Sequence, residues 1–146
     1  MIRRVAFAFV AIAVIPTSAS AQLAGGRSGS SSERWITGGR EVFDDLNDRF
    51  FHGLLARPRM TWSRDHARNR LGHYDPAHNA IVISRIFDHP SVPRYAVEYI
   101  VYHEMLHLKH PVRLRGSRRC VHSDEFQEEE KLFPRLGAAK SFLQRL

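Results

Sequence analysis

The feature that most constrains this fold is an apolar segment with ionisable side chains in its middle. Apolar residues recur at helical spacing between Pro93 and Lys109, and Pro111 prevents a helix from continuing far beyond that point. Within the segment the chain reads His103-Glu104-Met105-Leu106-His107. Residues four apart on a helix lie on one face, so both imidazoles project the same way. The sequence therefore predicts a helix that is buried in the core and carries a polar cluster.

Two imidazoles one helical turn apart can both reach one metal ion. Glu104 lies beside them, where its carboxylate can take a proton from a metal-activated water and later return it. Burying these three groups without a metal would cost much desolvation energy, which disfavours a purely structural role. The spacing is not that of a metzincin, HExxHxxGxxH, because His110 stands where glycine is required and Arg113 where histidine is required.

A catalytic zinc keeps three protein ligands and one open position, so a third ligand is expected downstream. The candidates from residue type alone are His110, Cys120, His122 and the acidic residues of the last long helix.

The remainder of the chain predicts an α+β domain with a short antiparallel sheet, the helix bearing HExxH, and C-terminal helices. The single cysteine excludes an internal disulfide, and a 43% apolar composition is that of a globular chain. The expected elements are a helix over 41–55, a strand over 60–63, a hairpin joining 71–74 to 80–84 through a turn, a helix over 124–133 capped by Ser123, and a short helix over 138–146.

The first residues have the pattern of a secretory signal peptide. Arg3 and Arg4 precede the apolar run 5–15, and Ala19-Ser20-Ala21 has the small residues of a cleavage site. The run is shorter than the ~20 residues that a membrane span needs, so we expect no stable membrane insertion of the mature chain. We expect a signal peptide over 1–21, a Gly/Ser-rich flexible linker over 22–36 and a domain over 37–146. The protein would then be secreted or periplasmic, or cytoplasmic if the start is mis-assigned.

Several of these segments together resemble the SprT-like zinc metalloproteases, a family that includes Spartan, a protease that acts on proteins crosslinked to DNA. The resemblance covers most of residues 37–136. It is carried by the segments 43–51, 58–63, 71–74, 81–84 and 103–107, and by His122-Ser123-Asp124-Glu125-Phe126. The expected domain over 37–146 is therefore a small zincin-like, SprT-like metalloprotease domain.

The resemblance implies that Zn²⁺ is held by His103, His107 and His122, with Glu104 as the general base in peptide-bond hydrolysis. In the family, the third ligand is a histidine that opens an H-[ST]-x-x-F segment, which His122 matches. The residues agree with this choice, because the loop between His107 and His122 is long enough to reverse the chain. His110 would distort tetrahedral geometry so close to His107, and Cys120 is more typical of an incidental thiol.

The implied partner is a protein or peptide substrate. The run 80–84 is the strongest β-strand signal in the chain, and we expect it to be an edge strand onto which an extended substrate can add.

Arginine accounts for most of the basic charge, and 22 Lys+Arg against 15 Asp+Glu give a net charge of +7. Such a surface can bind nucleic acid, as the resemblance to Spartan would suggest, but an exported protein does not meet chromosomal DNA. Nucleic acid is therefore not the favoured partner. The alternative function is a non-catalytic, zinc-stabilised basic module that binds nucleic acid or acidic polymers. The arginines cluster at Arg57, Arg59, Arg64, Arg68, Arg70, Arg113, Arg115, Arg118 and Arg119.

Overall fold

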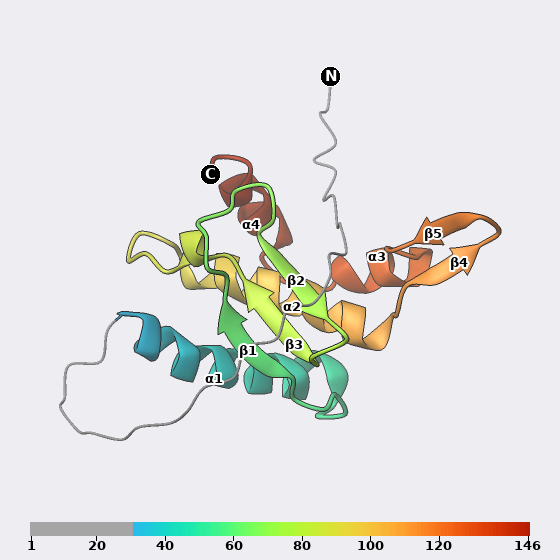
Figure 1. Cartoon of the computed structure of the whole chain (residues 1–146), viewed down its shortest axis with the longest axis horizontal. Coiled ribbons are helices and arrows are strands. Elements are labelled where there is room, and N and C mark those ends of the chain that lie inside the picture. The colour runs from blue at the N-terminus through green and yellow to red at the C-terminus, as the bar shows by residue number, and fades with distance from the viewer. Residues whose placement is uncertain (1–30) are drawn as a thin grey trace.

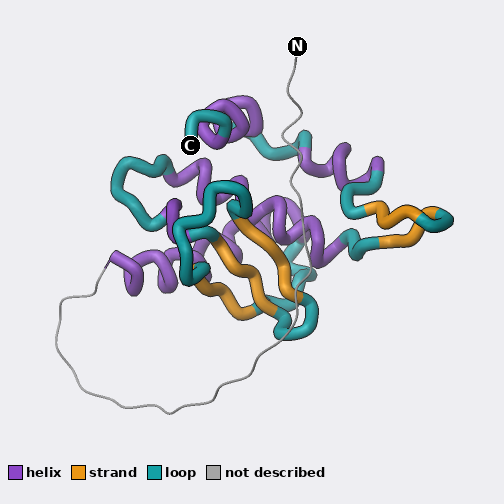
Figure 2. Tube along the Cα trace, turned by 45° about the horizontal axis from the view of Figure 1, so that its top comes forward, coloured by secondary structure: helices purple, strands orange, loops and turns teal. Residues whose placement is uncertain are grey.

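The computed structural model describes the backbone of residues 31–146 and the side chains of 39–146, apart from Arg115 and Arg118. It is an α+β domain, as the sequence predicts (Figures 1 and 2). In chain order its elements are α1 (Ser31–Phe51), β1 (Arg59–Trp62), β2 (Gly72–Asp75), β3 (Ala80–Ile83), a 3-10 turn η1 (Arg85–Phe87), α2 (Arg94–Lys109), β4 (Arg113–Arg115), β5 (Arg118–Cys120), α3 (Asp124–Glu130) and α4 (Leu136–Leu143).

Helix α2 is the centre of the domain and contacts α1, α3, α4, β2 and β3. The sequence between Tyr99 and Leu106 is buried without interruption, including His103 and Glu104. A helix that is enclosed on all sides must satisfy its polar side chains within the protein. The other elements therefore supply both the apolar packing and the polar partners of α2.

The three-stranded sheet is mixed, not antiparallel as expected. Strand β3 pairs antiparallel with β2, which confirms the predicted hairpin, and it pairs parallel with β1. The order β1-β3-β2 makes β3 the central strand, so the expectation that 80–84 forms an edge was wrong. Hydrophobic β-branched residues are typical of a central strand buried between two neighbours, so their presence in β3 does not indicate an edge. The edges of this sheet are β1 and β2.

Helix α1 ends earlier than predicted, at Phe51, because the next two residues leave the helical conformation. His52 and Gly53 have φ angles of 55° and 70°, and the Gly53 N–H donates to the Asn47 carbonyl at 3.0 Å. Two successive residues with positive φ end the helix, and the glycine among them is the local signal, because glycine adopts this conformation without strain. The helix also begins at Ser31, so residues 31–36, which we expected in a flexible linker, are helical.

A two-stranded hairpin, β4–β5, occupies the segment expected to be a loop after α2. It projects from the body of the domain (Figure 1). Gly116 adopts a φ of 64° in the two-residue turn Gly116-Ser117, a conformation that suits a tight hairpin. The Gly-Ser pair was the sequence feature that could have predicted this turn. The strands on either side are only three residues long and mostly arginine, so they lack the hydrophobic alternation that predicts a hairpin.

The C-terminal helices confirm the prediction with shifted bounds. Ser123 caps α3, and its hydroxyl accepts a hydrogen bond from the Phe126 N–H at 3.2 Å. Helix α3 ends at Glu130 and not at Phe133, and α4 begins at Leu136 and packs on α2.

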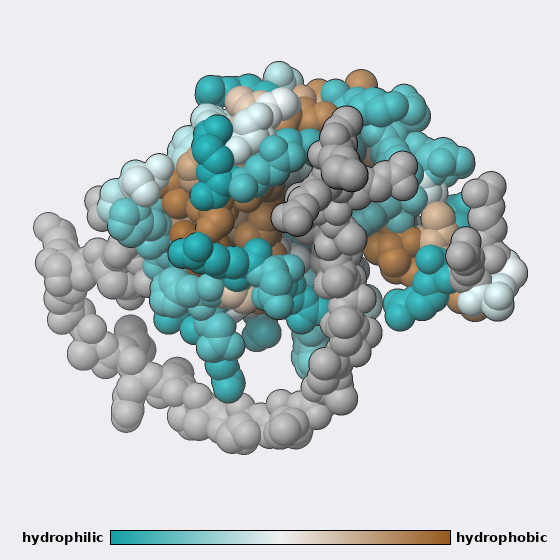
Figure 3. Space-filling model, turned by 90° about the horizontal axis from the view of Figure 1, so that it is seen from above, coloured by the Kyte–Doolittle hydropathy of each residue, from teal (hydrophilic) through white to brown (hydrophobic). Residues whose placement is uncertain are grey.

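The expected signal peptide and residues 22–30 of the expected linker lie outside the described residues. Within the part of the chain that the structure describes, no helix has the length and hydropathy needed to cross a membrane. Seen from above, most of the described surface is hydrophilic, with a few apolar patches between polar side chains (Figure 3).

Asn47 fixes the chain that leaves α1, which yields a prediction on stability. Its buried side chain donates to the Leu55 carbonyl at 3.0 Å and accepts from the Leu55 N–H at 3.1 Å. Asn47→Ala removes both hydrogen bonds and should lower the free energy of unfolding by about 1–3 kcal/mol, measured by urea denaturation. Asp48→Ala, at an exposed position on the same helix, should change it by less than about 0.5 kcal/mol. Equal losses in the two variants would contradict this role.

Candidate metal centre

Three imidazoles from two segments of the chain meet beside α2. His103 and His107 come from α2, and His122 comes from the turn before α3. One ring nitrogen from each of the three residues lies within 4.8 Å of the others. The ring centroids are 5.0–5.1 Å apart in all three pairs, so the rings surround one point. The structure thus brings together the three histidines that the sequence nominated.

The ring of Phe126 packs against all three histidines of this cluster. Its buried ring lies with its centroid 5.1 Å from His103, 4.8 Å from His107 and 4.6 Å from His122. An aromatic ring that touches all three imidazoles restricts their rotation and excludes water from one side. This contact explains why the segment that begins at His122 carries a phenylalanine four residues later, on the first turn of α3.

The protein keeps the histidines in the form that binds a metal. Burial, and the neighbouring rings of His103 and His122, lower the pKa of His107 to about 3. Burial and His103 lower the pKa of His122 to about 4. Both rings are therefore neutral near pH 7, with a lone pair available for coordination. A donor set of three imidazoles fits zinc, which takes nitrogen ligands at ~2.0–2.1 Å.

Glu104, the second residue of the motif, is completely enclosed. Its side chain packs against β2, where it accepts a hydrogen bond from the backbone N–H of Tyr74. Burial raises the pKa of Glu104 to about 7, although His103, the Tyr74 N–H and Arg70 each lower it. A carboxyl group with that pKa can both accept and release a proton near neutral pH.

A second carboxylate lies on the other side of His103. Glu130, at the end of α3, has Oε1 2.7 Å from His103 Nδ1 and 2.8 Å from the hydroxyl of Tyr99. Burial by itself would raise the pKa of Glu130, but hydrogen bonds from His103, Lys140 and Tyr99 and the charge of His103 lower it to about 2. Glu130 therefore stays ionised. Sequence reasoning treated the acids of this helix as candidate ligands and missed this supporting position, because only the fold places it behind His103.

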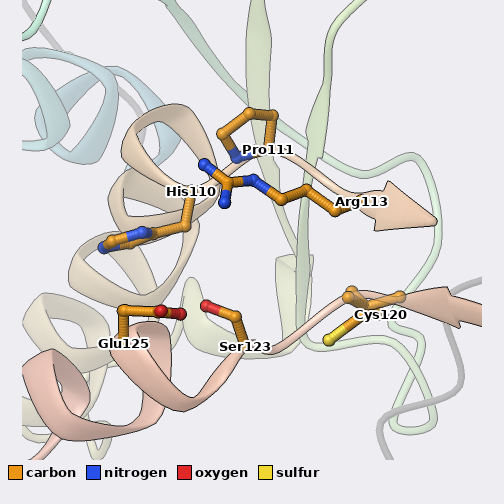
Figure 4. A pocket seen from close by; sticks show the side chains of 7 residues that line it. His110, Pro111, Arg113, Cys120, Ser123 and Glu125 are labelled. Atoms are coloured by element: carbon orange, nitrogen blue, oxygen red, sulfur yellow. The ribbon is translucent and has the colours of Figure 1, made fainter. Parts of the chain in front are cut away.

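The other candidate ligands lie outside the three-histidine cluster. His110, at the end of α2, is 3.3 Å from Glu129, and Cys120 ends β5. Both line a pocket of about 200 Å³, between the base of the hairpin and the start of α3 (Figure 4). The pocket contains groups of both charges, Arg113 and Glu125. Among the described residues, the one group of three or more side chains placed to hold a metal ion is His103, His107 and His122.

A buried helix with HExxH and a small mixed sheet are compatible with a small zincin-like domain, and its three histidines are placed so that they could hold a metal ion. The chain belongs to the SprT-like family, whose model matches residues 39–134. Neither a curated protein nor a solved structure matches the chain significantly.

Gly72 allows β2 to approach helix α2 closely. A Cβ at this position would lie 2.8 Å from Ile100 Cγ2 and 3.0 Å from Glu104 Oε1. Gly72→Ala should therefore push β2 away from α2 and lower the free energy of unfolding by about 1–3 kcal/mol, as overpacking does. Thermal denaturation measures the effect. Gly137→Ala is the matched control, because a Cβ there meets nothing within 4 Å and should not destabilise the protein. A neutral Gly72→Ala would show that the strand and helix have room between them.

The raised pKa of Glu104 predicts how metal-free protein responds to pH. Between its ordinary value of 4.5 and about 7, the folded state holds a proton that the unfolded state has released. Stability from this group is therefore present at low pH and is lost as the pH rises through 7, by about 3 kcal/mol in all. Glu104→Gln removes the loss, so in chelator it should be more stable than the wild type at pH 8 and close to it at pH 4.5. Urea denaturation at both pH values measures the difference. An equal difference at both would contradict a buried, titrating carboxyl.

Proposed function

We propose that the protein is a zinc-dependent metallopeptidase that hydrolyses peptide bonds, with His103, His107 and His122 as ligands and Glu104 as the general base. The observation that carries the proposal is the convergence of the three imidazoles beside a helix that also encloses Glu104. Membership of the SprT-like family supports the same reaction class.

A zinc ion held by the three histidines would supply a Lewis acid and would make water a nucleophile near neutral pH. The chain's own contribution to proton transfer is Glu104, which the Tyr74 N–H holds in place and which burial brings to a pKa of about 7. In its ionised form it takes a proton from the attacking water, and in its neutral form it gives that proton to the leaving amine. Phe126 and Glu130 hold the imidazoles in position during the reaction.

The substrate in this proposal is an extended peptide that lies along β2. This strand contacts α2 and, among the described residues, pairs with β3 on one side only. The Leu71 carbonyl accepts from the Ser84 N–H, so the alternation of an antiparallel ladder turns the backbone groups of Gly72 and Tyr74 toward the free edge. The Tyr74 N–H already reaches Glu104 there, which places this edge next to the general base.

Export also belongs to the proposal, because residues 1–21 have the pattern of a signal peptide. The enzyme would then act on proteins outside the cytoplasm, and nucleic acid would not be its partner. The alternative, a basic module that uses zinc only for structure, has no need of Glu104. A variant that lacks the Glu104 carboxylate therefore distinguishes the two functions.

Casein hydrolysis by purified protein tests the proposal. The wild type should contain one zinc and cleave casein, and a chelator should abolish cleavage. Glu104→Gln should keep the zinc and lose at least about a hundredfold in rate, because it removes the general base. His122→Ala should lose both zinc and activity, since two ligands hold the ion poorly.

The control is His78→Ala, an exposed histidine that pairs with Asp75 in the turn between β2 and β3. It should leave zinc content and cleavage unchanged. Cleavage that survives the chelator would overturn the metallopeptidase proposal, and zinc binding without any cleavage would favour the basic module.

A further inference from the structure

Glu130 joins three helices through one carboxylate. Its Oε1 accepts hydrogen bonds from His103 Nδ1 at 2.7 Å and from Tyr99 Oη at 2.8 Å, both on α2. Its Oε2 accepts from Lys140 Nζ on α4 at 3.0 Å. The Glu130 side chain is only 14% exposed, so water competes little for these contacts.

These hydrogen bonds fix the state of His103. A carboxylate can only accept, so the His103 nitrogen that faces it, Nδ1, must carry the proton. Whenever the ring is neutral, its lone pair is then on Nε2, the nitrogen available to a metal. Tyr99 donates to the same oxygen and restricts where Glu130 can move.

The contact with Lys140 brings in a helix beyond the family match. That match ends at residue 134, whereas α4 covers Leu136–Leu143. Ala139 is completely buried, and α4 packs on α2, so Lys140 starts from a fixed backbone. Its side chain is 46% exposed, which makes its contribution smaller than that of Glu130.

We propose that Glu130 is a positioning residue that sets the orientation and tautomer of His103, and that Lys140 makes α4 part of the support of the metal centre. The inference rests on the proposed function, because it assigns these residues to the same zinc site. It differs from a purely structural ion pair between α3 and α4, which would stabilise the fold without changing the state of His103.

Zinc affinity, measured by competition with a chromophoric chelator, is the first test. Glu130→Ala should weaken zinc binding about 10–100-fold, as loss of such a supporting contact does elsewhere. Lys140→Met should weaken it less than about tenfold. Glu128→Gln is the matched control, because this acid lies on the same helix, is exposed and pairs with Lys131, away from the histidines. It should bind zinc as the wild type does.

The tautomer of His103 is the second readout, and it needs no metal. Nitrogen-15 NMR of the metal-free wild type should show the Nδ1–H form at His103, and Glu130→Ala should show a mixture of tautomers. Glu130→Gln keeps an acceptor oxygen for His103 but turns an amide toward Lys140, where two donors would face each other. It should therefore bind zinc with intermediate affinity, and adding Lys140→Met should not weaken it further.

The outcomes separate the two proposals. A wild type that binds no zinc overturns the proposed function. This inference alone is overturned if the wild type binds zinc and the folded variants Glu130→Ala and Glu130→Gln bind it with the affinity of the wild type and keep the same His103 tautomer. Circular dichroism of each variant establishes that it is folded.

Discussion

The structure depends on the burial of α2, a helix that supplies much of the hydrophobic core and also carries His103, Glu104 and His107. Burying its ionisable side chains is costly unless the surrounding elements give them partners. Helix α3 supplies most of these. The Glu129 carbonyl accepts the Tyr102 hydroxyl at 2.7 Å, and the Glu130 carboxylate accepts the Tyr99 hydroxyl and His103. The packing of α3 on α2 and the organisation of the metal centre are thus the same set of contacts.

Two carboxylates flank the imidazoles, and the protein gives them opposite properties. Glu130 has three charged or polar donors, and these contacts lower its pKa to about 2 in spite of burial. Glu104 is more deeply enclosed, accepts a hydrogen bond from the Tyr74 N–H, and has a pKa of about 7. A group that stays charged can hold a neighbour in place, whereas a group that titrates near neutrality can carry a proton. The difference arises from hydrogen bonding and burial, since the two side chains are identical.

Local patterns in the sequence were enough to predict the elements that carry the site. The helical spacing of apolar residues predicted α2, and with it the shared face of His103 and His107. The turn residues between Tyr74 and Ala80 predicted the hairpin of β2 and β3. His122 was predicted from its place before a capped helix and from a family resemblance.

Features that depend on distant residues were not predictable in this way. The parallel pairing of β1 with β3 has no local signal, so a strand expected at the edge lies in the centre. The end of α1 depends on an Asn47 side chain that reaches Leu55. Glu130 resembles its acidic neighbours in sequence, and only the docking of α3 and α4 on α2 distinguishes it.

The projecting β4–β5 ribbon separates His107 from His122 along the chain but not in space. The helices on its two sides are joined directly, because Glu129 of α3 binds Lys109 at 2.8 Å and lies 3.3 Å from His110 at the end of α2. The contacts that hold the histidines therefore come from the helices on either side of the ribbon. A substitution in the ribbon would change the surface that this segment presents, while the contacts that hold the three histidines lie on the helices beneath it.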